Sequence, residues 1–286
     1  MSCLLGPQFP AWLQTKKYLE SLNLPYAGIS SVIAAWFWTG SYLSVDLSHN
    51  QIIGNIPSLH SFDIYLGSNN FTGPLPQISS DVAKLDPSNN LFCGYLSPML
   101  CRRTDKEVNL SLDISGNLLS GELPNCWMYS RELTMLKLGN NNLTGHIPSS
   151  MGYLIWLGSL HLLNNRFSGH FPLPLKNCSS LVVLDLSEKE FTGIIPAWMG
   201  NFNGKFIDMV PGDAEITYTP GLMVLILHSN KFNGSIPLEL CHLDSLQILD
   251  LGNSLEPFPD ALVISAAWSN KKIQVRPFLF IMNMIL

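Results

Sequence analysis

Charged residues are scarce in this sequence, and those present show no basic excess. Asp, Glu, Lys and Arg make up 13% of the 286 residues, with 16 basic against 21 acidic residues and a formal net charge of -5. A protein that binds nucleic acid through its phosphates needs a basic surface. We therefore expect no nucleic-acid partner.

Long apolar runs and catalytic signatures are missing as well. No stretch reaches the roughly 18 apolar residues of a membrane-spanning helix, and the first residues lack the apolar core typical of a cleavable signal peptide. The sequence has no HExxH, GxSxG, Walker or paired CxxC motif. The neighbours Cys241 and His242 lack the further ligands of a zinc site. We expect neither an enzyme nor a metal or cofactor site.

One motif, in contrast, is abundant. LKLGNNNLTGHIP at 136–148 returns as LDISGNLLSGELP (112–124), LHLLNNRFSGHFP (160–172), LDLSEKEFTGIIP (184–196) and LILHSNKFNGSIP (225–237). The central amide falls at Asn117, Asn141 and Asn165 and is replaced at Lys189, so successive copies are 24 residues apart. A fixed period of this size indicates a solenoid of stacked repeats.

The repeat positions can be given physical roles. Lys137 stands between two leucines on a short strand and must face away from them, because side chains alternate along a strand. Strands of successive repeats then stack in parallel about 4.8 Å apart and form one sheet along the inner curve. We expect the inward positions of this repeat to be Leu133, Leu136, Leu138, Leu143 and Ile147.

An inward asparagine follows the strand in most repeats. An amide has two donor hydrogens and one acceptor oxygen, so it can satisfy peptide groups of its own repeat and of the next one. Lys189 interrupts this series, although a lysine can direct its amine outward. Pro87 takes an inward strand position and removes a backbone donor. The asparagines of the predicted ladder are Asn50, Asn69, Asn90, Asn117, Asn141, Asn165 and Asn230.

The extended motif LxxLxLxxNxLxGxIP resembles the plant extracellular leucine-rich repeat. The segments LCHLDSLQILDL (240–251), LKNCSSLVVLDLS (175–187) and LPNCWMYSRELTMLKL (123–138) resemble plant receptor-like proteins of the fungal-elicitor and disease-resistance group. The resemblance implies an α/β leucine-rich-repeat solenoid, a curved horseshoe or superhelix with a parallel sheet on its concave face and loops or short helical segments on its convex side.

The same resemblance implies a function. In that group the ectodomain recognises microbial or damage-derived ligands at the extracellular face of the plasma membrane and signals through partner kinases. Two alternatives remain open: a soluble inhibitor of microbial pectin-degrading enzymes, which uses similar repeats, and a truncated fragment with no function of its own.

The repeats extend over 7–253, and a non-repeat tail follows at 254–286. Because the signal peptide, paired-cysteine caps and membrane helix of the group are not recognisable, we expect an internal ectodomain fragment. The interval from Lys189 to Asn230 is 41 residues instead of 24, which places an insertion near 201–221. This insertion either contacts a ligand or co-receptor or is a tolerated loop or splicing error, and the second interpretation is favoured.

Three outward residues are candidates for ligand binding. Lys137, His161 and Asp185 occupy the same strand position in consecutive repeats, so we expect one polar column that contacts a peptide or protein. The alternative is an ordinary solvated face. A histidine between a cation and a carboxylate also predicts a proton-sensitive contribution from His161.

Sequons and cysteines complete the candidate sites. Glycosylation is predicted at Asn70, Asn109, Asn142, Asn177 and Asn233 if the chain enters the secretory pathway. Pairing of the six cysteines cannot be deduced from their number. Cys126, Cys178 and Cys241 are interpreted as small buried thiols, and Cys93 with Cys101 is a possible but less favoured disulfide.

Overall fold

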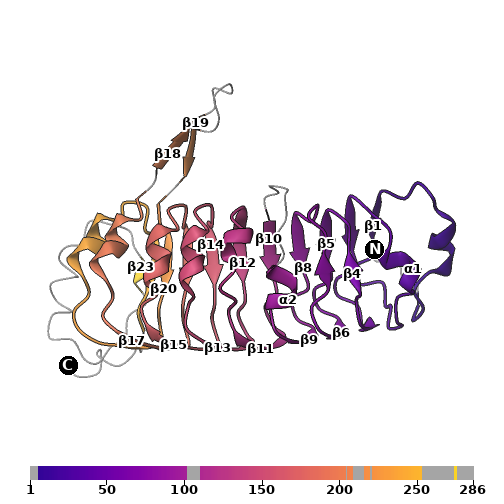
Figure 1. Ribbon diagram of the computed structural model, residues 1–286, viewed down its shortest axis with the longest axis horizontal. Helices are drawn as coiled ribbons and strands as arrows, with labels where there is room; N and C mark the ends of the chain where they lie inside the picture. Colours follow the sequence, from indigo (N-terminus) through magenta and orange to yellow (C-terminus); the bar gives the residue numbers. More distant parts are fainter. Residues whose placement is uncertain are drawn as a thin grey trace, which may run out of the picture. The chain divides into compact units, whose positions relative to one another are not determined.

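The computed structural model describes residues 6–101, 110–203, 205–208, 216–219, 221–252 and 274–275 (Figure 1). The contacts divide the chain into two compact units, residues 1–144 and 145–286. Each unit is a stack of repeats in which every turn of the chain contributes a strand to one parallel sheet and, in most repeats, a second short strand to another. The repeat architecture predicted from the 24-residue period is confirmed.

The first unit has six short parallel strands in its main sheet, which we call its β-sheet face. Val45 lies beside Ile64, and Ile64 beside Leu85, so each inward side chain neighbours the inward side chain of the next repeat. These strands are β1 (Ser21–Asn23), β2 (Ser44–Asp46), β5 (Asp63–Tyr65), β8 (Lys84–Asp86), β10 (Leu110–Asp113) and β12 (Leu133–Lys137).

A second parallel sheet in the first unit follows the asparagine positions. Its strands are β3 (Ile53–Gly54), β6 (Asn70–Gly73), β9 (Leu91–Gly94), β11 (Leu118–Glu122) and β13 (Asn142–Gly145). Strands β4 (Ser58–Leu59) and β7 (Gln77–Ile78) form a separate parallel pair. The remaining elements are short helical segments: η1 (Ala11–Thr15), α1 (Ala35–Trp38), α2 (Ser97–Leu100) and η2 (Trp127–Tyr129).

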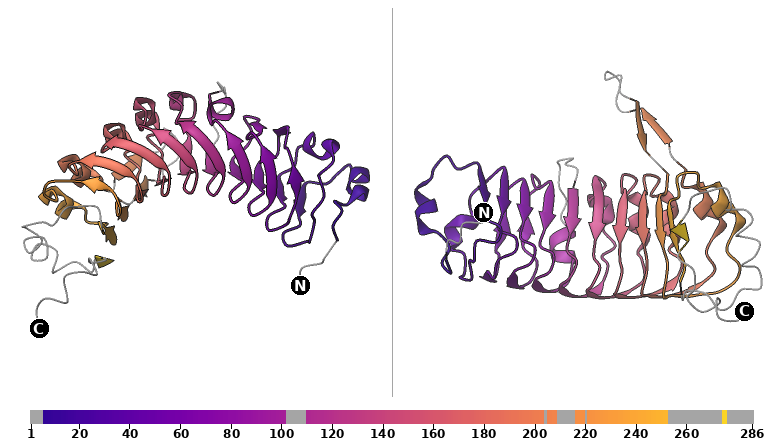
Figure 2. Two further views of the ribbon diagram at one scale, coloured as in Figure 1. Left: turned by 90° about the horizontal axis from the view of Figure 1, so that it is seen from below. Right: turned by 180° about the vertical axis from the view of Figure 1, so that it is seen from behind.

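The second unit repeats this plan. Its β-sheet face consists of β14 (Ser159–His161), β16 (Val183–Asp185), β20 (Val224–Ile226), β22 (Ile248–Asp250) and β23 (Gln274–Val275). Its second sheet consists of β15 (Arg166–His170), β17 (Glu190–Gly193) and β21 (Lys231–Phe232). One 3-10 turn per repeat closes the other side: η3 (Ser149–Tyr153), η4 (Leu173–Asn177), η5 (Ala197–Asn201) and η6 (Leu238–His242). Figure 2 shows the same elements from two further sides.

The insertion and the tail each add strands. Within the stretch 201–221, β18 (Lys205–Asp208) and β19 (Ile216–Thr219) pair as an antiparallel hairpin. From the tail at 254–286 the structure describes β23 alone, which pairs in parallel with β22. The backbone of these two residues therefore continues the sheet beyond the last recognisable motif.

The core is built from the inward positions of the motif. Leu133, Leu136, Leu138 and Leu143 are fully buried and Ile147 is nearly so, which confirms their predicted orientation. Phenylalanines two residues after the asparagine position stack along each unit. The ring centroids of Phe71 and Phe92 lie 6.1 Å apart in the first unit, and those of Phe191 and Phe232 lie 6.4 Å apart in the second.

The glycine of the motif is required by a close contact between repeats. A Cβ atom on Gly169 would run into the imidazole of His146, and one on Gly193 would lie 2.9 Å from Nδ1 of His170. Both glycines also have positive φ angles, +100° and +80°, which side chains disfavour. The residue after each glycine thus lies across the glycine of the next repeat.

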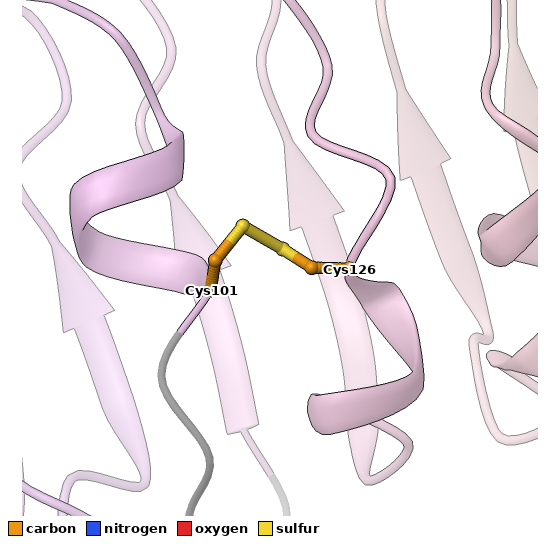
Figure 3. The surroundings of a disulfide bond; sticks show 2 residues. All are labelled: Cys101 and Cys126. Carbon is orange, nitrogen blue, oxygen red and sulfur yellow. A yellow bond between two sulfur atoms is a disulfide. The ribbon is translucent and has the colours of Figure 1, made fainter.

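The disulfide differs from the pairing considered from the sequence. Cys101 bonds to Cys126, with Cα atoms 5.4 Å apart (Figure 3), while Cys93 is an exposed thiol. Cys101 ends α2 and Cys126 precedes η2, so these two cysteines end and begin helical turns of successive repeats. Cys93 lies instead in β9 of the second sheet. The interpretation of Cys126 as a buried thiol is therefore wrong.

The other cysteines follow expectation to different extents. Cys178 is fully buried, its thiol donates to the carbonyl of Met151 at 3.4 Å, and burial raises its pKa to about 12. It therefore stays protonated and serves as a small core side chain, as predicted. Cys241 is half-buried rather than buried.

Candidate functional site: the β-sheet faces

The aspartates of the LDLS-like strands hold their own turns. One carboxylate oxygen accepts a hydrogen bond from the backbone N–H two residues later. The donor–acceptor distance is 2.9 Å for Ser48 on Asp46 and 3.0 Å for Ser187 on Asp185. Asp86, Asp113 and Asp250 make the same contact. Sequence analysis did not identify this contact, although the recurring Asp-x-Ser spacing was the signal for the turn.

The second carboxylate oxygen is left to face a neighbouring repeat. In the first unit Oδ2 of Asp113 lies 3.1 Å from Nζ of Lys137, whose side chain is 37% exposed. In the second unit Oδ2 of Asp185 lies 3.8 Å from Nδ1 of His161, and Nε2 of His161 lies 2.9 Å from the hydroxyl of Ser159. Each unit thus presents an oriented acid–base pair on its β-sheet face.

The environment of Asp185 fixes its charge. Burial acts to raise its pKa, but hydrogen bonds from His161 and Ser187 outweigh burial and lower the pKa below its ordinary value. Asp185 is therefore an anion at neutral pH. It is only 7% exposed, so it acts mainly by orienting His161.

The predicted column is divided between the two units. His161 and Asp185 are direct register partners in β14 and β16. Lys137 lies at the equivalent position in β12 of the first unit, where its ion-pair partner is Asp113. The structure thus brings two of the three residues together and adds Asp113, which the sequence analysis did not select.

A second row on the β-sheet face distinguishes the two units. In the second unit the apolar residues Val183, Val224 and Ile248 lie side by side in register at the first outward strand position, and the polar residues Ser159 and Gln274 stand at the two ends of this apolar row of three. None of the three is buried, and Ile248 is 36% exposed. In the first unit the same position is apolar at Met135 and otherwise carries Ser21, Ser44, Asp63, Lys84 and Ser111. Sequence analysis did not compare this position between repeats.

The asparagine positions form hydrogen-bonded ladders within the units. The amide nitrogen of Asn69 donates to its own repeat at Leu66 O (3.0 Å) and to the preceding repeat at Leu47 O (2.9 Å). Its oxygen accepts from the N–H of Ile52, also in the preceding repeat, at 3.0 Å. The cross-repeat bonds therefore run to the preceding repeat, not to the next one. The asparagines with amide bonds to their own repeat are Asn50, Asn69, Asn90, Asn117, Asn141, Asn165 and Asn230.

Lys189 occupies the ladder position without the chemistry of an amide. It is only 5% exposed, and its Nζ is buried with no hydrogen-bond partner, 5.7 Å from the centroid of the Phe167 ring. Burial lowers its pKa to about 7, against the opposing attraction of Asp185 and Glu188. The amine does not turn outward, as a lysine amine can, because the ladder position directs its side chain into the core.

The predicted glycosylation sites lie on other surfaces. Asn70 and Asn142 are exposed at the start of second-sheet strands, Asn233 is exposed just after β21, and Asn177 is exposed at the end of η4. Asn109 lies outside the described residues. Within the part of the chain that the structure describes, no sequon falls on a β-sheet face.

Neither a metal-binding cluster nor a membrane-spanning helix is present among the described residues. These residues contain no group of three or more His, Cys, Asp or Glu side chains that could hold a metal ion. No helix among them has the length and apolar character needed to cross a membrane.

Comparison with known proteins identifies the repeats. The Leucine Rich Repeat family profile matches residues 132–154, which include the end of the first unit and the start of the second, and residues 221–243 in the second unit. Together with the stacked parallel strands, these matches show a leucine-rich-repeat fold. The curated relatives of this leucine-rich-repeat chain include Receptor-like protein EIX2 of Solanum lycopersicum, which is 36% identical over 142 residues, 47% of this chain and 14% of that protein. Receptor-like protein 7 of Arabidopsis thaliana is 33% identical over 125 residues, 41% of this chain and 12% of that protein.

Solved structures agree with the fold. The ectodomain of the Arabidopsis thaliana receptor kinase GASSHO1/SCHENGEN3, in complex with CASPARIAN STRIP INTEGRITY FACTOR 2, gives a TM-score of 0.67 at 26% identity over 87% of this chain and 29% of that one. A plant ice-binding protein gives a TM-score of 0.61 at 18% identity, over 90% of this chain and 79% of that one. At this identity the similarity shows the fold alone. The relatives with receptor names agree with the prediction of a non-enzymatic chain. The chain spans less than a fifth of the length of the curated relatives it matches.

Proposed function

We propose that this chain is a ligand-recognition segment of a plant cell-surface receptor-like protein, and that its β-sheet faces contact a peptide or protein. The observation that carries the proposal is the oriented acid–base pair on each face, Lys137 with Asp113 and His161 with Asp185. In both pairs the aspartate is held by its own turn, so the basic partner is pre-oriented for contact at little further entropic cost.

Two features support an extracellular site. The Cys101–Cys126 disulfide belongs to an oxidising compartment. The four described sequon asparagines are exposed, and they lie away from the β-sheet faces. Glycans on those surfaces would leave the faces open to a ligand.

The finer assignment extends the resemblance to the fungal-elicitor and disease-resistance group. In this proposal the complete protein acts in defence signalling, its ligand is microbial or damage-derived, and a partner kinase transmits the signal. The similarity to a receptor ectodomain solved in complex with CASPARIAN STRIP INTEGRITY FACTOR 2 supports a ligand-binding role. The column Lys137, His161 and Asp185 contributes through Lys137 and His161, with Asp185 as the positioning residue.

A chimaeric receptor tests the recognition role. The repeats 110–200 replace the corresponding repeats of a full-length receptor-like protein whose peptide ligand is known to bind that region, and the secreted chimaera is titrated with that peptide. We expect Lys137→Glu to lower the affinity at least about tenfold without changing the melting curve, as for a central contact residue. Lys176→Glu, the same charge change at an exposed position on η4, is the matched control and should bind as the unaltered chimaera does.

Two results would count against recognition by these faces. A folded, secreted chimaera that no longer binds the peptide would remove this region from ligand contact. Equal affinities for Lys137→Glu and Lys176→Glu would move the contact away from the column.

Glycosylation is tested separately. Given a secretion signal in plant cells, the chain should gain mass that an endoglycosidase removes, and Asn70→Gln with Asn142→Gln should abolish part of that gain. If no shift in mobility occurs, the sequons no longer support passage through the secretory pathway.

A further inference from the structure

The starting observation is a gap in the ladder of the second unit. At the equivalent position Asn230 donates to the carbonyls of Leu186 and Leu227, both at 2.8 Å, and accepts from the N–H of Phe191 at 3.2 Å. Lys189 has no acceptor atom when charged, so it cannot serve the N–H of Phe167 in the same way. Its own Nζ is buried and has no hydrogen-bond partner.

The groups around Nζ decide which protonation state the fold tolerates. On its own turn Asp185 and Glu188 are the charged neighbours. Asp185 already accepts hydrogen bonds from Ser187 and faces His161 of the preceding repeat. The Phe167 ring covers the amine from that repeat.

Among the described residues of the following repeat, no carboxylate contributes to the electrostatics of the amine. It carries the neutral amide of Asn230 at the ladder position, with His228 two residues earlier. A buried ammonium without hydrogen-bond acceptors costs far more than a buried neutral amine.

We propose that Lys189 is a proton-sensitive switch in the second unit: the turn from Asp185 to Lys189 is closed when the amine is neutral and opens more readily when it is protonated. Opening lets the ammonium reach water, and it breaks the Asp185–Ser187 turn that orients His161. A role of this switch in regulating ligand recognition rests on the proposed function. The pH-dependent opening of the turn is independent of that function.

The direction of the pH effect on turn opening, and the pH range in which it acts, follow from proton linkage. An open turn binds the proton as an ordinary lysine does, with a pKa of about 10.4, whereas burial in the closed turn lowers the Lys189 pKa to about 7. Protonation therefore favours opening progressively as the pH falls from about 10 to about 7, and the effect levels off at lower pH. Raising the pH above neutrality tightens the turn.

Hydrogen exchange on the full chain tests the switch. Amide exchange of peptides covering 159–193 is measured at about pH 7 and about pH 9 and corrected for the intrinsic exchange rate. Linkage predicts roughly fiftyfold less opening at the higher pH. Peptides covering 44–86 in the first unit serve as an internal reference and should show no such change.

Variants separate Lys189 from every other titrating group. Lys189→Met removes the amine and should abolish the pH dependence. Lys189→Asn, which restores the side chain used in the other repeats, should abolish it too and exchange more slowly at pH 7, so the test survives if the methionine variant fails to fold. Lys231→Met, at an exposed lysine paired with Glu190 in the same unit, should keep the pH dependence of the unaltered chain.

Two outcomes would overturn the proposal. One is equal opening of 159–193 at both pH values in the unaltered chain. The other is a pH dependence that persists in Lys189→Asn. Neither outcome involves ligand binding, so a failure of the switch is distinguishable from a failure of the recognition role.

Discussion

Each unit carries a residue that departs from the repeat motif, Pro87 in the first and Lys189 in the second, and these two departures differ in kind. In the first unit Pro87 lies directly after β8 rather than within the strand. Its ring is buried and its carbonyl still accepts from Asn90 at 3.2 Å and Asn117 at 3.1 Å. It lacks only the N–H that Leu66, one repeat earlier, donates to Asp86 at 2.7 Å. In the second unit Lys189 stands where other repeats have an asparagine, whose amide bonds to two repeats, as that of Asn230 does. The missing N–H of Pro87 costs one backbone hydrogen bond. The missing asparagine at position 189 leaves a buried amine without a hydrogen-bond partner.

The largest expected effect comes from restoring the ladder. Lys189→Asn should stabilise the second unit by about 4 kcal/mol at pH 7, because it removes a buried amine that is half protonated there. The gain should shrink to about 2 kcal/mol at pH 9, where the closed form is neutral. Denaturant-dependent hydrogen exchange resolves the two units. A gain that does not change with pH would contradict the assigned burial of the amine.

The disulfide allows the stability of the first unit to be lowered while the second unit is left unchanged, because both cysteines lie in the first unit. Replacing Cys101 and Cys126 together by Ser opens a loop with a sequence separation of 25 residues, which should destabilise the first unit by about 3 kcal/mol. The second unit serves as the control. If both units lose stability equally in the same exchange experiment, they do not unfold independently.

Two glycine substitutions compare a position where an added Cβ atom would collide with a neighbour and a position where it would not. Gly169→Ala in the second unit should cost about 2 kcal/mol, from backbone strain together with the collision with His146. Gly94 in the first unit also has a positive φ, +88° against +100° for Gly169, but nothing lies within 4 Å of an added Cβ atom. Gly94→Ala should therefore cost about 1 kcal/mol from strain alone. Chemical denaturation of both variants measures the difference. Equal costs would mean that His146 moves aside freely.

The smallest change in stability is expected from replacing Pro87. Pro87→Leu should stabilise the first unit by about 1 kcal/mol, the usual net contribution of one hydrogen bond. The gain should be independent of pH, unlike that of Lys189→Asn. A change as large as the ladder restoration would reverse the ranking of the two departures.

These departures also show how far the sequence predicts the structure. The inward residues, the parallel sheets and the inward direction of Asn141 follow from strand alternation and the repeat period, which are local properties. The cysteine pairing did not follow, because it depends on which helical turns of neighbouring repeats meet.

The candidate site was less predictable than the fold. Strand alternation placed Lys137 and His161 outward, but it could not show that Asp185 is nearly covered or that Asp113 is the partner of Lys137. Both depend on side-chain geometry between repeats. The burial of Lys189 had a similar cause: a long flexible chain can turn outward in principle, yet the backbone at the ladder position points into the core.

The Cys101–Cys126 bond has a consequence for the integrity of the polypeptide. The intervening sequence contains three trypsin cleavage sites, after Arg102, Arg103 and Lys106. A chain cut at any of them remains a single covalent molecule, because the bond joins the fragments on either side of the break. Such a nicked chain runs at full size on a non-reducing gel and separates into two pieces only after reduction, so intact mass alone does not report an intact backbone.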